Sequence, residues 1–333
     1  MSQKRWIALV VAAALFLASI TLQFFSSIAT ADFENLFNFE DPNQNFNEKV
    51  VETGSGNNKI AVLHLNGVIQ DTAPSSLINT NSYHHKRFLD MLDQAGEDRQ
   101  VDGIILRVNT PGGGVVESAE IHDKILEIQE QYEKPIYISM GNTAASGGYY
   151  IAAPADKIVA HHGTLTGSIG VIMESFNFAE FADEHGIDFN TIKSGEYKDI
   201  MSMSREMTDD ERAILQTMID DMYTEFVQVI VNGRDMTEER VRELGDGRIY
   251  TGAQAQEVDL VDELGSLDDT IEMMRTEHEL TKAQVIEYEP GLNFNQWIGG
   301  SVQIMLGAES DLIGIKDLLR ENNAPRAMYL YSH

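Results

Sequence analysis

Between residues 59 and 153 the sequence alternates apolar runs of strand length with segments of helical spacing, and this alternation constrains the fold most strongly. Runs rich in Val and Ile predict strands, whereas apolar residues three and four positions apart predict amphipathic helices. Strands and helices that alternate with short connections are typical of an α/β domain, in which helices cover a buried sheet. The predicted strands are 59–69, 101–108 and 135–140, and the predicted helices are 83–95, 116–132 and one that begins at Tyr149.

One strand-to-helix joint carries the residues of a nucleophile site. The stretch 141–150 reads GNTAASGGYY, so that small residues precede Ser146 and two glycines follow it. Without a Cβ, Gly147 and Gly148 allow the backbone of a substrate to come very close. The N–H of Gly147 could also meet a developing oxyanion. A tight packing joint between a strand and a helix would use the same residue types.

A second glycine-rich joint lies at the end of the preceding strand. Residues 109–114 read NTPGGG and open the helix 116–132, so they can present free N–H groups to an anion. A phosphate loop is excluded, because no Gly-Lys-Ser/Thr follows and no G-x-G-x-x-G occurs. Two strand ends with glycines, one of which also holds a serine, favour an oxyanion hole.

A serine nucleophile needs a base, and a lysine fits this role better than the histidines. Of the nine histidines, His64 lies in a predicted strand, His84 and His85 at a helix start, and His161 and His162 at a strand end. Burial disfavours the charged form of a lysine amine and lowers its pKa from about 10.4. A neutral lysine could then take the proton of Ser146. The segment 188–199, DFNTIKSGEYKD, offers Lys198 and Lys193, and spacing alone does not distinguish them.

Composition excludes several classes of site. The chain of 333 residues has no cysteine and a formal net charge of −29. Disulfides, thiolate catalysis and cysteine-ligated metals are therefore excluded. The acidic excess repels nucleic acid and polyanionic cofactors. We expect no nucleic-acid partner, no cofactor and no metal ion.

Residues 6–28 contain no charged side chain and predict a transmembrane anchor. A helix of about twenty apolar residues spans a bilayer. Because Lys4 and Arg5 precede the anchor and an acidic chain follows it, we expect a cytoplasmic N-terminus and an extracytoplasmic bulk. Residues 29–31, Ala-Thr-Ala, leave cleavage by signal peptidase open as an alternative.

The sequence predicts five successive parts. The acidic, Asn-rich stretch after the anchor is typical of a linker, and the end of the chain lacks helical periodicity, so we expect a mobile tail. That this tail enters a neighbouring active site is a hypothesis. The parts are a cytoplasmic stub at 1–5, the anchor at 6–28, a linker at 29–57, a catalytic domain at 58–280 and a C-terminal extension at 281–333.

Four motifs in this order resemble the bacterial signal peptide peptidase A family, also called protease IV, in its short membrane-anchored form. They are NTPGGG, AASGGYYIA, T-x-x-G-S-I-G-V and KSGEYKD, and the resemblance covers roughly residues 58–275. It implies the Clp-protease or crotonase-like fold with a repeated ββα core. Asp259 departs from the family, whose members usually have glycine there, but aspartate tolerates a left-handed conformation. The implied site has Ser146 as nucleophile, Lys198 as general base, the N–H groups of Gly113 and Gly147 as oxyanion hole, and Ser168 as the residue that orients the lysine.

The expected function is that of a membrane-bound serine endopeptidase that degrades remnant signal peptides after their release from exported preproteins. The resemblance also implies a homo-oligomeric ring in which Ser and Lys meet across a subunit boundary. Two alternatives stay open: a crotonase-like acyl-CoA enzyme, and a catalytically silent membrane-associated scaffold.

Overall fold

The computed structural model describes residue 5 and residues 46–71, 83–290 and 327–331. The chain divides into two units, Met1–Asn45 and Phe46–His333, and the fold below is that of the second unit. The predicted anchor at 6–28 lies outside the described residues. Among the helices that are described, none is both long enough and apolar enough to cross a membrane.

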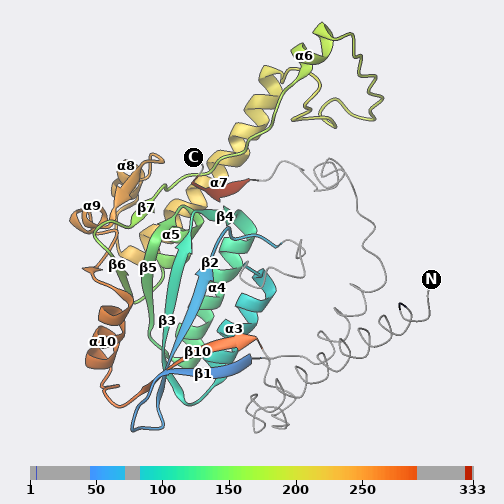
Figure 1. Ribbon diagram of the computed structural model, residues 1–333. Coiled ribbons are helices and arrows are strands. Elements are labelled where there is room, and N and C mark those ends of the chain that lie inside the picture. Colours follow the sequence, from blue (N-terminus) through green and yellow to red (C-terminus); the bar gives the residue numbers. More distant parts are fainter. Residues whose placement is uncertain (1–4, 6–45, 72–82, 291–326, 332–333) are drawn as a thin grey trace. The chain divides into compact units, whose positions relative to one another are not determined.

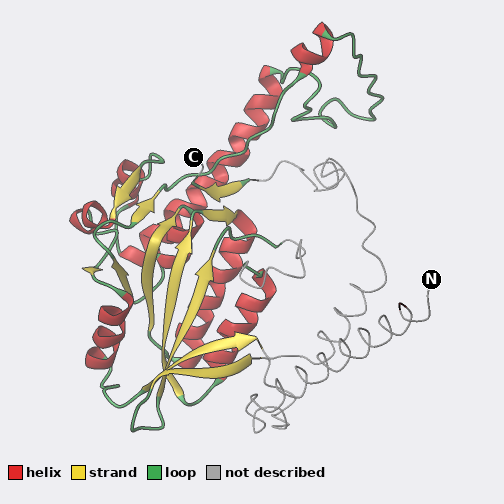
Figure 2. Ribbon diagram, in the orientation of Figure 1, coloured by secondary structure: helices red, strands yellow, loops and turns green. Residues whose placement is uncertain are grey.

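A mostly parallel sheet of nine strands forms the centre of the fold (Figures 1 and 2). Its order is β1-β10-β2-β3-β5-β6-β9, with β7 beside β5 and β8 beside β7. Only the pairs β1–β10 and β7–β8 are antiparallel in this sheet. The strands are β1 Phe46–Glu52, β2 Lys59–Asn66, β3 Val101–Thr110, β5 Ile136–Ala145, β6 Lys157–Ala160, β7 Leu165–Gly167, β8 Ile249–Thr251, β9 Glu263–Leu264 and β10 Gln284–Pro290, and a separate pair is formed by β4 Gly112–Gly114 and β11 Met328–Leu330.

Helices cover both faces of the sheet and create two hydrophobic cores. Because side chains alternate along a strand, Ala61 and Leu63 face the larger core while Ile60 and Val62 face the smaller one. The larger core lies under α3, α4, α5 and α7, and the smaller one lies under α10. The helices are α3 His85–Glu97, α4 Val115–Tyr132, α5 Gly147–Ala152, α6 Ala179–Glu184, α7 Asp209–Arg234, α8 Glu238–Leu244, α9 Gly252–Glu257 and α10 Leu267–Glu277.

Local sequence signals determine where several helices begin and end. Thr208 begins α7 with a capping box, in which its hydroxyl accepts the N–H of Glu211 and the Glu211 carboxylate accepts the N–H of Thr208. Helix α4 follows the glycine turn directly and ends at Glu133, which has a left-handed φ of 52°. Asp259 also has a left-handed φ, 63°, which confirms that aspartate occupies this conformation.

The predicted α/β class and the alternation of strands and helices are confirmed, and the parallel sheet is consistent with the expected crotonase-like core. The predicted strand 135–140 is longer than expected, because β5 continues to Ala145. The helix predicted to begin at Tyr149 begins at Gly147, so strand and helix are joined by Ser146 alone.

The nine-stranded sheet extends beyond residues 58–280, the predicted bounds of the catalytic domain. Strand β1 lies in the predicted linker, and β10 lies in the predicted extension. The sequence did not predict β1, because it is an edge strand whose side chains are mostly polar and exposed. Its buried residue, Phe46, is 4% exposed and contacts Tyr288 of β10. Residues 328–330 of the expected mobile tail form β11.

We predict that Ile138→Ala lowers the free energy of unfolding by about 2–5 kcal/mol, because Ile138 is fully buried on the central strand β5 and its truncation leaves a cavity. Val116→Ala is the matched control, since Val116 is 66% exposed. We expect the control to stay within about 0.5 kcal/mol of the wild type. Urea denaturation measures both, and equal losses in the two variants would contradict the packing described above.

Candidate active site

Ser146 occupies a strained turn between β5 and α5. Its φ and ψ are 52° and −114°, a region that residues other than glycine rarely adopt. The turn is held by three backbone hydrogen bonds: Ser146 N donates to Gly167 O at 2.7 Å, and Ser146 O accepts the N–H groups of Tyr149 and Tyr150. Such strain persists only where the surrounding structure enforces it, and it is concentrated at functional sites.

The Ser146 hydroxyl is buried without a partner. The residue is 1% exposed, and no described residue forms a hydrogen bond with its Oγ. Most buried hydroxyls in native proteins are paired, so an unpaired one needs an explanation. A nucleophile that awaits its base and its substrate provides one.

The two glycines of the predicted oxyanion hole lie next to each other. A Cβ added to Gly147 would lie 3.1 Å from Gly113 N and 2.7 Å from Ser118 Oγ. A Cβ added to Gly113 would lie 1.8 Å from Ile69 O, so this position also excludes larger residues. The structure thus brings Gly113 and Gly147 together beside Ser146, and their role as oxyanion donors stays a prediction.

Two buried hydroxyls that the sequence analysis missed hold the glycine turn. Thr110 Oγ1 accepts the N–H of Gly112 at 3.0 Å, which supports the φ of +107° at this glycine. The Ser118 hydroxyl donates to Gly114 O at 2.8 Å. A signal was available for Thr110, because a threonine two residues before a glycine is typical of a side-chain-supported turn. For Ser118 no local signal existed.

Ser168 leaves the sheet beside Ser146. In the parallel pairing of β5 with β7, Ala145 is opposite Gly167, so the two serines follow paired residues. Ser168 is 9% exposed and has a positive φ of 50°, close to that of Ser146. Its N–H donates to Arg248 O at 2.8 Å. The pairing thus brings the backbone of Ser168 beside that of Ser146, and the role of Ser168 in orienting a lysine stays a prediction.

Lys198 is not brought to Ser146. It lies on the segment between α6 and α7, which projects from the sheet in Figure 1, and its side chain is exposed. Within the described part of the chain it has no ion pair. The other candidate, Lys193, donates to Asp199 Oδ1 and to Glu196 O at 2.7 Å each. An ammonium held by a carboxylate is a poor base, so the contacts favour Lys198.

Comparison with known proteins identifies the family. The profile of peptidase family S49 matches residues 128–281. The chain is 39% identical over 346 residues to a protein of Enterococcus faecium named "Putative signal peptide peptidase SppA", with 99% of each chain covered. The chain belongs to peptidase family S49. It is also 33% identical to Protease 4 of Haemophilus influenzae over 64% of this chain and 34% of the relative.

As an S49 peptidase the protein is a serine peptidase. The family membership does not support the alternative of an acyl-CoA enzyme. All of β5 and α5 and the segment with Lys198 lie inside the matched residues 128–281, while the glycine turn lies before them. Among the described residues, no cluster of three or more acidic or histidine side chains could hold a metal ion.

The C-terminal strand β11 of this S49 peptidase lies beside the glycine turn. It pairs antiparallel with β4, so that Tyr329 is opposite Gly113, and Met328 exchanges two backbone hydrogen bonds of 3.0 Å with Ile172. Tyr329 is fully buried and stacks on Tyr150 with ring centroids 4.9 Å apart. The extended chain of the tail therefore lies next to Gly113, a predicted oxyanion donor.

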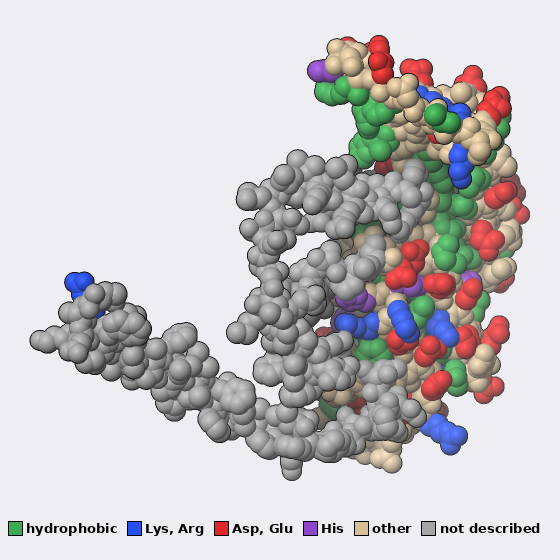
Figure 3. All heavy atoms as spheres, turned by 90° about the vertical axis from the view of Figure 1, so that its right-hand side faces the viewer, with side chains coloured by type: hydrophobic (Ala, Val, Ile, Leu, Met, Phe, Trp, Pro, Cys, Tyr) green, Lys and Arg blue, Asp and Glu red, His purple; other side chains and the backbone are tan. Residues whose placement is uncertain are grey.

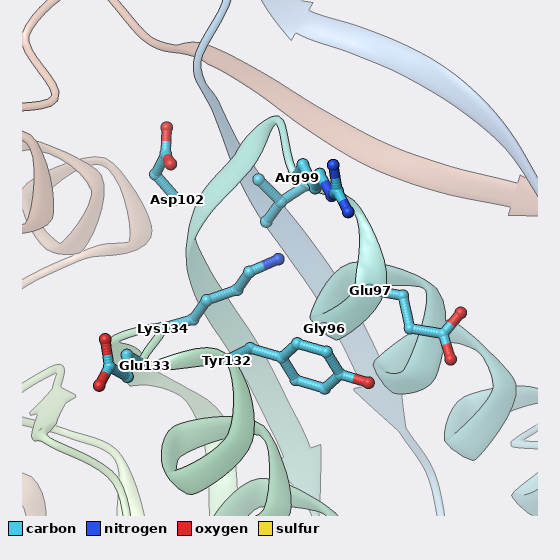
Figure 4. Close-up of a pocket in the computed structure, with 8 residues that line it drawn as sticks. Gly96, Glu97, Arg99, Asp102, Tyr132, Glu133 and Lys134 are labelled. Carbon is cyan, nitrogen blue, oxygen red and sulfur yellow. The ribbon is translucent and has the colours of Figure 1, made fainter.

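A cavity of about 290 Å³ lies at the opposite ends of the strands (Figure 4). Its walls come from the start of β3 and the ends of α3 and α4, whereas Ser146 follows the carboxyl end of β5. Lys134 fills part of it and donates to Ala95 O and Asp98 O at 2.9 and 2.6 Å. Burial lowers the pKa of Lys134. Because the amine of Lys134 is already hydrogen-bonded, this cavity is no alternative to the site at Ser146. The residues that line it are Gly96, Glu97, Arg99, Val101, Asp102, Tyr132, Glu133 and Lys134.

We predict that Gly147→Ala lowers kcat of peptide hydrolysis on the order of a hundredfold or more, because the new methyl group displaces a predicted oxyanion donor. Gly163→Ala is the control, since a Cβ there meets only His161 Nδ1 at 3.6 Å. Kinetics with a fluorogenic apolar peptide measure both variants. Full activity of folded Gly147→Ala would show that this N–H is not needed.

We also predict that removal of residues 327–333 raises kcat/KM on the order of tenfold. Substrate can bind beside Gly113 only while β11 is absent from this position, so the tail reduces the fraction of chains that are open to substrate. Tyr329→Phe is the control, since it retains the ring that packs on Tyr150. Unchanged kinetics after truncation would mean that β11 does not compete with substrate.

Proposed function

We propose that this chain is a membrane-bound serine endopeptidase with a Ser146–Lys198 dyad, and that it degrades remnant signal peptides after their release from exported preproteins. The observation that carries the proposal is the strained turn at Ser146, whose buried Oγ has no partner among the described residues. The name of the relative from E. faecium supports peptides of this kind as substrates. The apolar segment 6–28 supports a membrane anchor with an extracytoplasmic catalytic domain.

The reaction would follow the serine-lysine pattern of acyl transfer. Ser146 Oγ attacks the carbonyl carbon of the scissile peptide bond, and its proton passes to the neutral Lys198 Nζ. The N–H groups of Gly113 and Gly147 stabilise the oxyanion of the tetrahedral intermediate. The C–N bond then breaks, and the leaving amine takes the proton from Lys198. Lys198 Nζ then takes a proton from a water molecule, and the resulting hydroxide attacks the acyl-enzyme. The ester bond to Ser146 breaks, and Ser146 Oγ receives the proton from Lys198.

The separation of Lys198 from Ser146 within one chain supports a site that two copies of the chain share. Large apolar side chains are exposed on α6, just before it and on the segment after it that carries Lys198. Figure 3 shows hydrophobic side chains gathered at the top of the face that it presents. Apolar patches of this kind mark interaction surfaces in soluble domains. We therefore infer a homo-oligomeric ring in which a neighbouring copy covers this surface and supplies the base. The most exposed of these residues are Phe176 at 86%, Phe181 at 60%, Ile187 at 52% and Ile192 at 102%.

The position of β11 supports an extended binding mode for the substrate. A strand that pairs with β4 and with Ile172 receives main-chain hydrogen bonds on both sides, as in other cases of β-strand addition. The carbonyl groups of a substrate bound in this way would lie beside Gly113, a predicted oxyanion donor. Signal-peptide remnants are released as free chains and can adopt such an extended form.

Complementation between two inactive variants tests both the dyad and the shared site. We predict that Ser146→Ala and Lys198→Ala are each inactive, and that co-assembly of equal amounts restores about a quarter of the wild-type activity. In a ring with random mixing, about one site in four combines an intact serine with an intact lysine from its neighbour.

The outcomes separate the parts of this proposal. Each homogeneous variant is the control for the mixture, and both should remain folded and oligomeric. If the mixture stays inactive although the copies have mixed, the two residues do not meet across a subunit boundary. If either variant alone retains wild-type activity, the dyad is wrongly assigned. An inactive wild-type protein would instead support the scaffold alternative.

A further inference from the structure

A network of charged side chains surrounds the residue next to Lys198. Asp199 accepts hydrogen bonds from Lys193 Nζ at 2.7 Å, from Arg205 Nε at 2.9 Å and from Arg205 Nη2 at 2.7 Å. Both oxygens of its carboxylate are therefore occupied by cations. The side chain of Asp199 is 16% exposed, so these contacts are partly shielded from water.

Arg205 connects this segment to the beginning of α7. Its Nη1 donates to Glu211 Oε2 at 2.8 Å, its Nη2 donates to the other oxygen of the same carboxylate, and Nη2 also donates to Asp199 O at 3.1 Å. Glu211 is 2% exposed and belongs to the capping box with Thr208. Further along α7, Phe226 is fully buried in the larger core. The backbone beside Lys198 is thus fixed to the core through Asp199, Arg205 and Glu211.

The pairing leaves one cation of the segment unpaired. Lys193 and Arg205 both form ion pairs with Asp199, whereas Lys198, its direct neighbour in the chain, has none within the described residues. Hydrogen bonds from Arg205 and then from Lys193 hold the pKa of the Asp199 carboxyl well below its usual range. Arg205 likewise lowers the pKa of Glu211.

The remaining charged groups near the network are acidic. Glu196 and Glu206 contact it through their carbonyl oxygens, which accept hydrogen bonds from Lys193 and Arg205. The pKa of Tyr197 is raised, first by the charge of Glu196 and further by Asp210 and Glu211 at the start of α7. The carboxylate next to Lys198 in the chain is thus the one that two cations occupy.

We propose that Arg205 is a positioning residue for the peptidase reaction: it occupies the carboxylate of Asp199, so that the amine of Lys198 remains unpaired and available as a base. This inference rests on the proposed function, in which Lys198 takes the proton of Ser146. Arg205 acts through Asp199 and does not itself contact the substrate.

The direction of the expected effect follows from the charges. A carboxylate near an amine stabilises the charged form of that amine. A general base acts only in its uncharged form, so kcat/KM rises with pH as the base of the free enzyme loses its proton. Release of Asp199 from Arg205 therefore moves the rising limb of the pH–rate profile to higher pH.

The test compares pH–rate profiles of the full-length protein and three variants: Arg205→Gln, Asp199→Asn and the double variant. We predict that the rising limb of Arg205→Gln moves up by about one pH unit. Without Arg205, the Asp199 carboxylate keeps only Lys193 as a partner and becomes available to the amine of Lys198, its neighbour in the chain. In the double variant the limb returns to the wild-type position or below it, because no carboxylate remains at residue 199.

Arg212→Gln is the matched control. Arg212 is an exposed cation on the same helix α7 as Glu211, it has no ion pair in the described part of the chain, and its loss changes the net charge by the same amount. Arg205→Gln also leaves the buried Glu211 unpaired, so thermal unfolding is measured in parallel. A purely structural role of Arg205 would lower the thermal stability and kcat of both variants that lack it, without moving the limb.

Lys198→Ala separates failure of this inference from failure of the proposed function. If Lys198→Ala is inactive and the limb of Arg205→Gln coincides with that of the wild type, only the role of Arg205 is overturned. If Lys198→Ala is active, both the dyad and the role of Arg205 are overturned. A shifted limb that Asp199→Asn restores supports the inference, because a change in folding alone would not be reversed by loss of a second charge.

Discussion

The parallel pairing of β5 with β7 is the interaction on which the site depends. It continues to Ala145 and Gly167, and the hydrogen bond from Ser146 N to Gly167 O, 2.7 Å long, ends it. Both chains then leave the sheet at the same level, through Ser146 and Ser168, which both have positive φ values. A residue in such a conformation costs on the order of 1–3 kcal/mol, which the buried sheet and α5 must offset. The strain is thus a consequence of how the sheet ends.

The parts of the fold and site that the sequence predicted are those with short-range causes. Apolar periodicity located the central strands and helices, and the glycines around Ser146 marked the place where backbones approach closely. Gly113 and Gly147 are far apart in the chain, but they follow β3 and β5, which are neighbouring parallel strands, and the carboxyl ends of such strands lie together. The edge strand β1 was not predicted, because its charged side chains face water. The strand β11 was not predicted either, because its pairing partners are distant in sequence and leave no local periodicity.

The base could not be placed by the same reasoning. Lys198 lies outside any strand or helix, and its surroundings are set by Asp199, Arg205 and Glu211, whose contacts depend on the path of the segment before α7. Spacing gave no preference between Lys198 and Lys193, whereas the ion pair from Lys193 to Asp199 does. A contact among charged side chains, invisible to periodicity, therefore decides which amine is available.

The exposure of Lys198 has a consequence for regulation of the proposed reaction. Water surrounds the amine of an exposed lysine, whereas a general base acts only in its uncharged form. Contact with a second copy would remove this water and place the amine in a less polar environment, where the neutral form is favoured. In the proposed ring the same contact would cover the apolar side chains near Lys198 and complete the site at Ser146. Proteolytic activity would then appear only after assembly, and an isolated chain would remain inactive while it folds.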